Sequence, residues 1–273
     1  MLATTADTTA GTIAGDRRKV MANVNSERSG CMKSVVDFHT HVLPQVDDGS
    51  ASIEESLALL RMEAEQGIRQ VVATPHFYAQ VDAIKPFLER RTAALSRLRE
   101  AMQDDPTLPQ LSIGAEVHYF SGIGKADILE ALAIDNGYCV MIEMPMREWT
   151  DQMYWDLENI HQNFGLVPIV AHIDRYISPL NNHGIPDRLM ELPVIVQANA
   201  SFFQRFSTRG LALRMLEKRQ IHLIGSDCHN LNYRPVNIKP TVDLIQSKLG
   251  QQTIARINAL EQKILTASSE NIV

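Results

Sequence analysis

Cysteine is scarce in this chain of 273 residues, which contains only Cys31, Cys139 and Cys228. The three cysteines form no close-spaced pair and are too few for the disulfide framework that holds small secreted proteins together. This usage fits a reducing compartment better than an oxidising one, and we therefore expect the protein to be cytoplasmic.

Long apolar runs and an excess of positive charge are also missing. A membrane-spanning helix needs about 18 or more consecutive apolar residues, and no such run is present, so we expect no membrane insertion. The formal net charge is -6 at pH 7, which argues against a surface that binds nucleic acid through bulk positive charge. With 45% apolar and 21% charged residues, the composition is typical of a soluble globular protein.

The first 33 residues lack any regular pattern. They are rich in Ala, Thr, Ser and Gly, and they contain neither the apolar stretch of a secretion signal nor a helical or strand period. We expect residues 1–33 to be a disordered N-terminal extension. Residues 34–273 contain no repeat and no low-complexity linker, so we expect them to form one domain.

The segment VVDFHTHVLPQVDDG, residues 35–49, carries the strongest chemical signal in the chain. A short apolar run leads into His39 and His41, which are separated by one residue. Side chains alternate along an extended chain, so both imidazoles point to one side and could chelate a metal ion. Two histidines alone are weak evidence, because a solvated loop can carry them by chance.

Apolar runs and helical periods alternate along the rest of the sequence. Ser52 and Glu55 form a capping box, and the helix that it starts is predicted to end at Gly67. Further helices are predicted at residues 83–102, about 151–163 and 208–219, and two more close the chain. Seven short strands are predicted within residues 35–38, 68–76, 111–119, 138–145, 166–176, 193–201 and 221–230. This alternation predicts an α/β fold, a barrel of about seven parallel strands covered by helices.

Metal-binding residue types stand where most of these strands end. They are His39, His41, His76, Glu116, Glu143, His172, Asp227 and His229. The carboxyl ends of the strands in a parallel barrel share one face, on which active sites are built. Each residue alone could be an ordinary hydrogen-bonded or water-facing side chain. Together they predict one site for divalent cations that take nitrogen and oxygen ligands.

The segments HTH, VDDG, ATPH, GAE, MIE, AHIDRY and GSDCHN resemble the polymerase-and-histidinol-phosphatase (PHP) superfamily. Within it, the block LPQVDDGSASIEESLALLRMEAEQGIRQVVATPH is similar to the metal-dependent bacterial tyrosine-protein phosphatases of capsule and exopolysaccharide regulation. The resemblance extends from Val35 to about Arg234. It implies a distorted (βα)7 TIM-like barrel, the PHP fold, with three divalent metal ions, commonly manganese, with iron or zinc as alternatives.

The same resemblance implies a role for each site residue. His39, His41, Glu116 and Asp227 would hold the first ion. Glu116 would bridge to a second ion, held with Glu143 and His172, and Asp48, His76 and His229 would hold the third. Arg175 and Arg234 match the positions that hold the phosphate, and Asp48 and His229, near the third ion, could protonate the leaving group. The chain departs from the usual pattern at Ile173, Asp174 and Cys228, none of them a ligand in this scheme.

Three divalent ions and two arginines would outweigh the ligand carboxylates, so a phosphate dianion is attracted despite the acidic chain. We therefore expect hydrolysis of phosphotyrosine on a protein, and the resemblance implies that this partner is an autophosphorylated bacterial tyrosine kinase that controls capsule or exopolysaccharide synthesis. A small-molecule phosphatase, such as histidinol-phosphate phosphatase, is the alternative among enzymes. A non-catalytic metal-binding regulator is the alternative outside them.

A cysteine-dependent mechanism is a further alternative, because Arg234 follows Cys228 by six positions, as in cysteine-dependent tyrosine phosphatases. The loop between them has no glycine, although backbone loops that bind phosphate favour it. The neighbouring Asp227 would also raise the thiol pKa rather than lower it. Both features argue against this mechanism.

Overall fold

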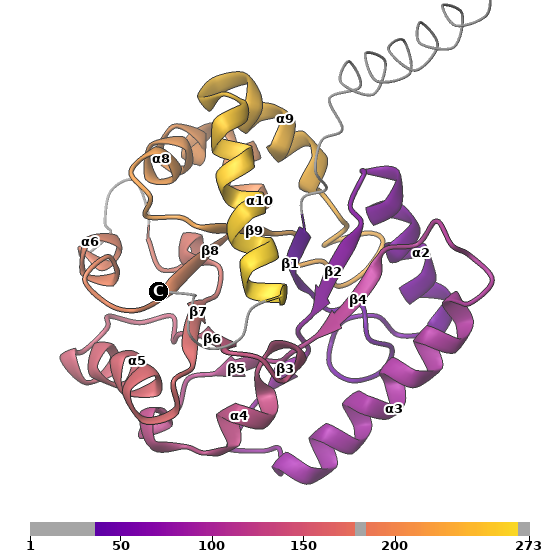
Figure 1. The fold of residues 1–273 in the computed structure, drawn as a ribbon, viewed down its shortest axis with the longest axis horizontal. Coiled ribbons are helices and arrows are strands. Elements are labelled where there is room, and N and C mark those ends of the chain that lie inside the picture. The colour runs from indigo at the N-terminus through magenta and orange to yellow at the C-terminus, as the bar shows by residue number, and fades with distance from the viewer. Residues whose placement is uncertain (1–35, 178–183, 267–273) are drawn as a thin grey trace, which may run out of the picture. The chain divides into compact units, whose positions relative to one another are not determined.

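The computed structural model describes residues 36–177 and 184–266 of the chain. The predicted N-terminal extension, residues 1–33, lies outside these residues. Within them, helices surround a central group of strands, as Figure 1 shows.

The described residues contain nine strands. These are β1 (Val36–Thr40), β2 (Gln70–Ala73), β3 (His76–Phe77), β4 (Gln110–Ile113), β5 (Glu116–His118), β6 (Cys139–Glu143), β7 (Val167–Val170), β8 (Ile195–Asn199) and β9 (Leu223–Gly225). The strand order is β1-β2-β4 in one sheet and β3-β5-β6-β7-β8-β9 in the other. Every pairing between these strands is parallel, as the sequence predicts.

Two of the seven predicted strands are broken in two, which explains the larger number. One break lies between Ala73 and His76 and contains Pro75, which has no N–H to donate. The other lies between Ile113 and Glu116. Backbone hydrogen bonds cross both breaks, because Gly114 N–H donates to Ala73 O (2.9 Å) and Glu116 N–H donates to Pro75 O (3.0 Å). Thus β3 continues the course of β2, and β5 continues that of β4.

The first and last strands lie side by side. Thr40 and Cys228 form a parallel bridge. Asp227 N–H donates to His39 O at 2.8 Å, and His41 N–H donates to Cys228 O at 2.9 Å. The parallel sheet is therefore strongly curled, and β9 lies beside β1 (Figure 1).

Nine α-helices cover the strands within the described residues. They are α2 (Ile53–Glu65), α3 (Ile84–Met102), α4 (Ile128–Leu132), α5 (Asp151–Phe164), α6 (Ile185–Leu189), α7 (Ala200–Gln204), α8 (Phe206–Glu217), α9 (Ile238–Leu249) and α10 (Gln251–Thr266). The sequence did not predict α4, α6 and α7, because five residues are too few to show a helical period. No helix in the described part of the chain is long and apolar enough to cross a membrane.

The start of α2 confirms Ser52 as the predicted N-cap, but the Glu55 carboxylate bonds to the residue before the cap and does not complete the capping box. Ser52 Oγ accepts a hydrogen bond from Glu55 N–H at 3.2 Å, and Glu55 Oε2 accepts one from Ala51 N–H at 2.9 Å. After the helix, Gly67 has a φ of 85°, a conformation that glycine adopts without strain. This helix is the connection between the His39–His41 segment and β2.

Two clusters of buried apolar side chains fill the fold. The larger lies between the strands and the helices and includes Leu59, Leu98, Leu157 and Leu216. The smaller, which we call the inner core, lies on the other face of the sheet. The inner core contains Val36, Phe38, Val72, Ile134, Cys139, Met141, Val167, Ile169, Ala171, Ile195, Leu223 and Ile264. Burying each large side chain contributes about 1.5–3 kcal/mol, so both clusters stabilise the packing of the sheet.

Candidate metal centre

Four side chains form the most deeply buried part of the site, which we call the first group: His39, His41, Glu116 and Asp227. The Nε2 atoms of His39 and His41 lie 3.2 Å apart. Glu116 Oε2 lies 3.1 Å from the first and 3.4 Å from the second. Asp227 Oδ1 lies 3.6 and 3.5 Å from the same two atoms. All four predicted residues therefore meet at one point.

An irregularity in β1 turns His39 toward this point. Val36 and Phe38 belong to the inner core, so strict alternation along the strand would turn His39 to the opposite face. The pairing register with β2 shifts between Asp37 and Thr40. Such a bulge re-aims side chains, and here Phe38 and His39 both face the inner side of the sheet.

The second group consists of Glu116, Glu143 and His172. His172 Nε2 lies 2.7 Å from Glu116 Oε1 and 3.4 Å from Glu143 Oε1. Glu116 consequently turns one oxygen to each of the first two groups. His76 also reaches this region, and its ligand atom can share a point with those of Glu116 and Glu143.

The third group lies nearest the surface. Asp48 Oδ1 lies 3.6 Å from Nε2 of His76 and 3.6 Å from Nε2 of His229. The structure adds His41 to these three residues, since all four ligand atoms lie within 4.8 Å of one another. The Asp48 side chain is 71% exposed, so the cluster extends from the buried interior to solvent.

Strained backbone brings two of the site residues into place. His172 has a φ of 31° and Asp227 a φ of 56°, in the left-handed region that residues other than glycine seldom adopt. Ala171 faces the inner core, so alternation would turn His172 away from it, and the unusual φ returns the imidazole to the cluster. Non-glycine residues persist in this conformation where surrounding contacts hold them, often at functional sites.

Asp47 orients the histidines, although the sequence analysis did not single it out. Its Oδ2 lies 2.6 Å from His41 Nδ1 and accepts a hydrogen bond from His76 N–H at 2.9 Å. Its other oxygen accepts from Gly49 N–H at 3.0 Å. The signal in the sequence was its place beside Asp48 in the VDDG segment, but nothing there distinguishes the two aspartates.

Two polar residues of β8 were also missed. Gln197 Oε1 accepts a hydrogen bond from His172 N–H (2.6 Å) and lies 3.3 Å from His39 Nδ1. Asn199 Nδ2 donates to Asp227 Oδ2 at 2.9 Å. Asn199 ends β8, which is the same signal that identified the other strand ends, whereas Gln197 is a polar residue in the middle of this buried strand.

Carboxylates make the cluster favourable for positive charge. Burial disfavours the charged form of His41, but the hydrogen bond to Asp47 and the nearby Glu116 carboxylate outweigh burial and raise its pKa to about 10. Burial opposes protonation of His172 in the same way, and its bonds to Glu116 and Glu143 raise its pKa to about 9. The same field would stabilise a divalent cation at this place.

His229 differs from these histidines. Burial and the nearby His41 charge lower its pKa to about 4. His229 is therefore neutral at pH 7, and neutral imidazole is the form that binds a metal ion.

Buried polar atoms that face the cluster without a hydrogen bond within the described residues include His76 Nδ1 and Glu116 Oε2. His76 Nδ1 and Glu116 Oε2 are 3.0 Å apart, but their geometry is not that of a hydrogen bond. Buried polar atoms usually have a partner. Nitrogen and oxygen atoms that converge without hydrogen bonding to one another fit divalent metal ions.

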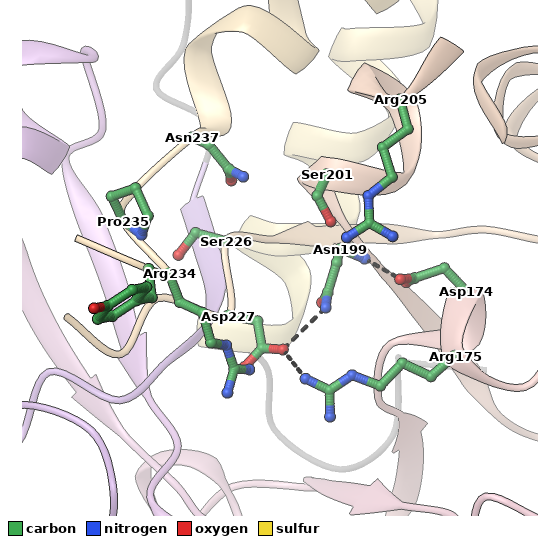
Figure 2. A pocket seen from close by; sticks show the side chains of 11 residues that line it. Asp174, Arg175, Asn199, Ser201, Arg205, Ser226, Asp227, Arg234, Pro235 and Asn237 are labelled. Atoms are coloured by element: carbon green, nitrogen blue, oxygen red, sulfur yellow. Dashed lines mark hydrogen bonds and ion pairs between the residues drawn. The ribbon is translucent and has the colours of Figure 1, made fainter. Parts of the chain in front are cut away.

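Arg175 and Arg234, predicted to hold phosphate, lie at the edge of the cluster and both form ion pairs with Asp227. Arg175 also lies 3.3 Å from Glu143 Oε1, and Arg234 Nη1 lies 2.8 Å from His229 Nε2. Their side chains are 30% and 36% exposed. Both line a pocket of about 370 Å³, shown in Figure 2, so a phosphate in the pocket can contact each of them.

Cys228 lies outside this pocket lining and is fully buried in the larger apolar core. Burial, followed by the charges of Glu63 and Asp37, raises the pKa of its thiol well above the usual value. A nucleophilic cysteine must be an accessible thiolate. The structure therefore argues against the cysteine-dependent alternative.

A family model described as "Capsular polysaccharide synthesis, CpsB/CapC" matches residues 35–266. The tyrosine-protein phosphatase CpsB of Streptococcus pneumoniae is 28% identical over 225 residues, which are 79% of this chain and 91% of CpsB. The tyrosine-protein phosphatase YwqE of Bacillus subtilis is 26% identical over 229 residues, which are 80% and 86% of the two chains.

Comparison with solved structures shows a similar fold in proteins of the same kind. A structure from a study of YwqE and CpsB, called there unique metal-dependent tyrosine phosphatases, superposes with a TM-score of 0.73 at 19% identity. This match covers 85% of this chain and 94% of the other. Histidinol phosphate phosphatase from Lactococcus lactis gives a TM-score of 0.53 at 13% identity, covering 78% and 93%. These comparisons confirm the resemblance noted in the sequence, and the chain belongs to the CpsB/CapC family of capsular polysaccharide synthesis.

Proposed function

We propose that this protein is a metal-dependent phosphatase that hydrolyses phosphotyrosine on a protein substrate. The observation that carries the proposal is the convergence of histidines and carboxylates beside a pocket that two arginines line. Family relatives that are named tyrosine-protein phosphatases support the choice of substrate. Because the family model concerns capsular polysaccharide synthesis, the proposed partner is an autophosphorylated bacterial tyrosine kinase of that process, in the cytoplasm.

The metal centre would hold three divalent ions, with manganese as the proposed metal and iron or zinc as alternatives. The proposed ligands are those of the three groups: His39, His41, Glu116 and Asp227; Glu116, Glu143 and His172; Asp48, His76 and His229. Their separations, and the buried ligand atoms without hydrogen bonds, support this assignment. Such ions supply a nucleophilic water near neutral pH and neutralise charge on the phosphate.

The chain itself would bind and orient the substrate. Arg175 and Arg234 offer planar guanidinium groups that can each hold two phosphate oxygens. Asp48 and His229 lie in the outermost group and are the proposed residues for proton transfer to the tyrosyl oxygen, with His229 the poorer donor because its pKa is lowered. A phenolic leaving group needs little help from an acid, so a strongly tuned proton donor is unnecessary.

We also propose that the curled sheet closes as a distorted (βα)7 barrel, the PHP fold. The paired courses of β2 with β3 and of β4 with β5, and the bridge between Thr40 and Cys228, support closure. In this proposal residues 34–273 form the phosphatase domain.

A comparison of two substrates, with and without a chelator, tests the proposal. Purified protein should hydrolyse a phosphotyrosyl peptide faster than histidinol phosphate, and a chelator should stop the reaction. Preference for histidinol phosphate would favour the small-molecule alternative on this fold. Stoichiometric metal binding with no turnover of either substrate would favour the non-catalytic regulator.

A further inference from the structure

A third arginine, Arg205, lines the same pocket on its other side. It lies between α7 and α8, where the backbone is extended (φ -68°, ψ 129°). In Figure 2 its guanidinium group lies near Ser201 and Asn199, across the pocket from Arg234. The pocket thus has arginines at both ends.

The Arg205 guanidinium differs from the other two because it has no hydrogen bond or ion pair with any described residue. Its hydrogen bonds are those of its backbone, since Arg205 N–H donates to Ser201 O (3.2 Å) and its carbonyl accepts from Arg209 N–H (2.9 Å). In contrast, Arg175 and Arg234 both pair with Asp227. Arg205 therefore presents an uncompensated positive charge to the pocket.

The carboxylates of the pocket are engaged elsewhere. Asp227 is neutralised by its two arginines. Asp174 Oδ1 accepts a hydrogen bond from Asn199 N–H at 2.9 Å. Neither aspartate forms an ion pair with Arg205, so its charge is available to an incoming group.

Other polar groups accompany Arg205 in the pocket wall. The Asn237 side-chain oxygen is buried and has no hydrogen bond within the described residues. The Ser201 hydroxyl lines the same wall. The Ser201 hydroxyl can donate a hydrogen bond to a carboxylate that Arg205 attracts, whereas the unpaired Asn237 oxygen is an acceptor and suits an N–H of the peptide backbone.

We propose that Arg205 forms a second anion subsite, which binds the carboxylate of an aspartate or glutamate next to the phosphotyrosine of the substrate. This inference rests on the proposed function, which places the phosphate near Arg175 and Arg234. The pocket continues from there to Arg205, so the group that reaches Arg205 belongs to a neighbouring residue of the peptide. A guanidinium fork matches the two oxygens of a carboxylate, which makes Arg205 specificity-determining.

Two phosphotyrosyl peptides that differ only in their flanking residues test this subsite. One carries glutamate on both sides of the phosphotyrosine, and the other carries glutamine. The manganese-loaded wild type should have a kcat/KM about fivefold higher for the glutamate peptide, the scale of a partly exposed charge-assisted contact. Arg205→Gln should remove this preference, and Arg205→Lys should retain part of it.

Arg97→Gln is the matched control, because it removes the same charge from an exposed position on α3 outside the pocket lining. This control should keep the wild-type preference. Arg205→Ala repeats the measurement with a different side chain, and bound metal is measured in every variant.

Equal kcat/KM for both peptides in the wild type would overturn the subsite, and so would a preference that persists in Arg205→Gln and Arg205→Ala. Hydrolysis of both phosphotyrosyl peptides would still uphold the proposed function in these cases. Failure of the wild type to hydrolyse either peptide would instead overturn the proposed function, and the subsite with it.

Discussion

Asp47 Oδ2 lies 2.6 Å from His41 Nδ1, and this contact leaves His41 Nε2 facing the metal centre. The same carboxylate oxygen accepts the backbone N–H of His76. A carboxylate that binds the far nitrogen of a ligand histidine fixes its tautomer and ring orientation. Asp47 is thus a positioning residue for two histidines from different parts of the chain, His41 just after β1 and His76 in β3.

We predict that Asp47→Ala lowers metal affinity by about 10–100-fold, the usual cost of losing such a partner. Asp47→Asn should be intermediate, because an amide oxygen can still accept from imidazole N–H but carries no charge. Competition with a chelator, followed by metal analysis, measures the effect. Unchanged metal affinity in both variants would contradict this role and leave Asp47 only its hydrogen bond within the loop, to Gly49 N–H.

Removal of metal should abolish hydrolysis of phosphotyrosine, and added manganese should restore it. The cluster offers only nitrogen and oxygen atoms, and its carboxylates favour hard cations. Turnover is measured after chelation and after addition of each ion in turn. Full activity of metal-free protein would contradict the metal-dependent mechanism.

Cys228→Ala should retain most activity, whereas His39→Ala should lose nearly all of it. Cys228 is fully buried with a raised thiol pKa, and His39 lies at the centre of the first group. Alanine is preferred to serine at position 228 because a buried hydroxyl without a partner costs stability. Loss of activity on thiol alkylation of the wild type, but not of Cys228→Ala, would instead support a role for the thiol.

Arg175→Lys and Arg234→Lys should each lose about 2–4 kcal/mol of transition-state stabilisation, the scale for one preorganised charge donor. Lysine keeps the charge but lacks the planar fork that holds two oxygens. Steady-state kinetics and metal content are measured on the same samples. Because both arginines pair with Asp227, loss of metal in parallel with activity would show that they act by positioning Asp227.

Much of the site could be predicted from the sequence because metal-binding residue types stand at or near the ends of apolar strands. His39 and Asp227 follow or lie in apolar strands, and parallel strands bring such positions to one face. The orientation of individual groups could not be predicted. Asp47 and Asp48 are equivalent in sequence, and only the loop geometry turns one toward His41 and the other to solvent. His172 would face away from the cluster by simple alternation, and its positive φ depends on tertiary contacts.

The same limit applies to the fold. Alternating apolar runs and helical periods predicted the parallel sheet and its long helices. The break at Pro75 within one predicted strand depends on pairing with Thr40 and Gly114, which lie far away in the sequence. The pairing of Arg175 with Asp227 likewise joins residues 52 positions apart, so no local pattern reveals it.

Glu261 on α10 gives a prediction about stability and pH. Its side chain is fully buried, and Oε2 accepts a hydrogen bond from Val36 N–H at 3.0 Å. Burial raises its pKa from 4.5 to about 8, although that hydrogen bond acts in the opposite direction. Asp37 and Glu63 are buried nearby, and burial raises their pKa values as well.

Since the folded protein holds this proton more tightly than the unfolded chain, stability should fall as pH rises from about 4.5 to 8 and then level off. Glu261→Gln keeps the shape and the acceptor oxygen but cannot ionise. Over this pH range its free energy of unfolding should therefore fall by about 2–4 kcal/mol less than that of the wild type. Denaturant unfolding at pH 5, 6.5 and 8 measures this free energy.

Glu89→Gln, at an exposed position on α3, is the control and should keep the wild-type slope of stability against pH. Asp37 and Glu63 remain in the Glu261 variant and should leave a residual slope. If Glu261→Gln and the wild type decline equally with pH, Glu261 is not the group that holds the proton.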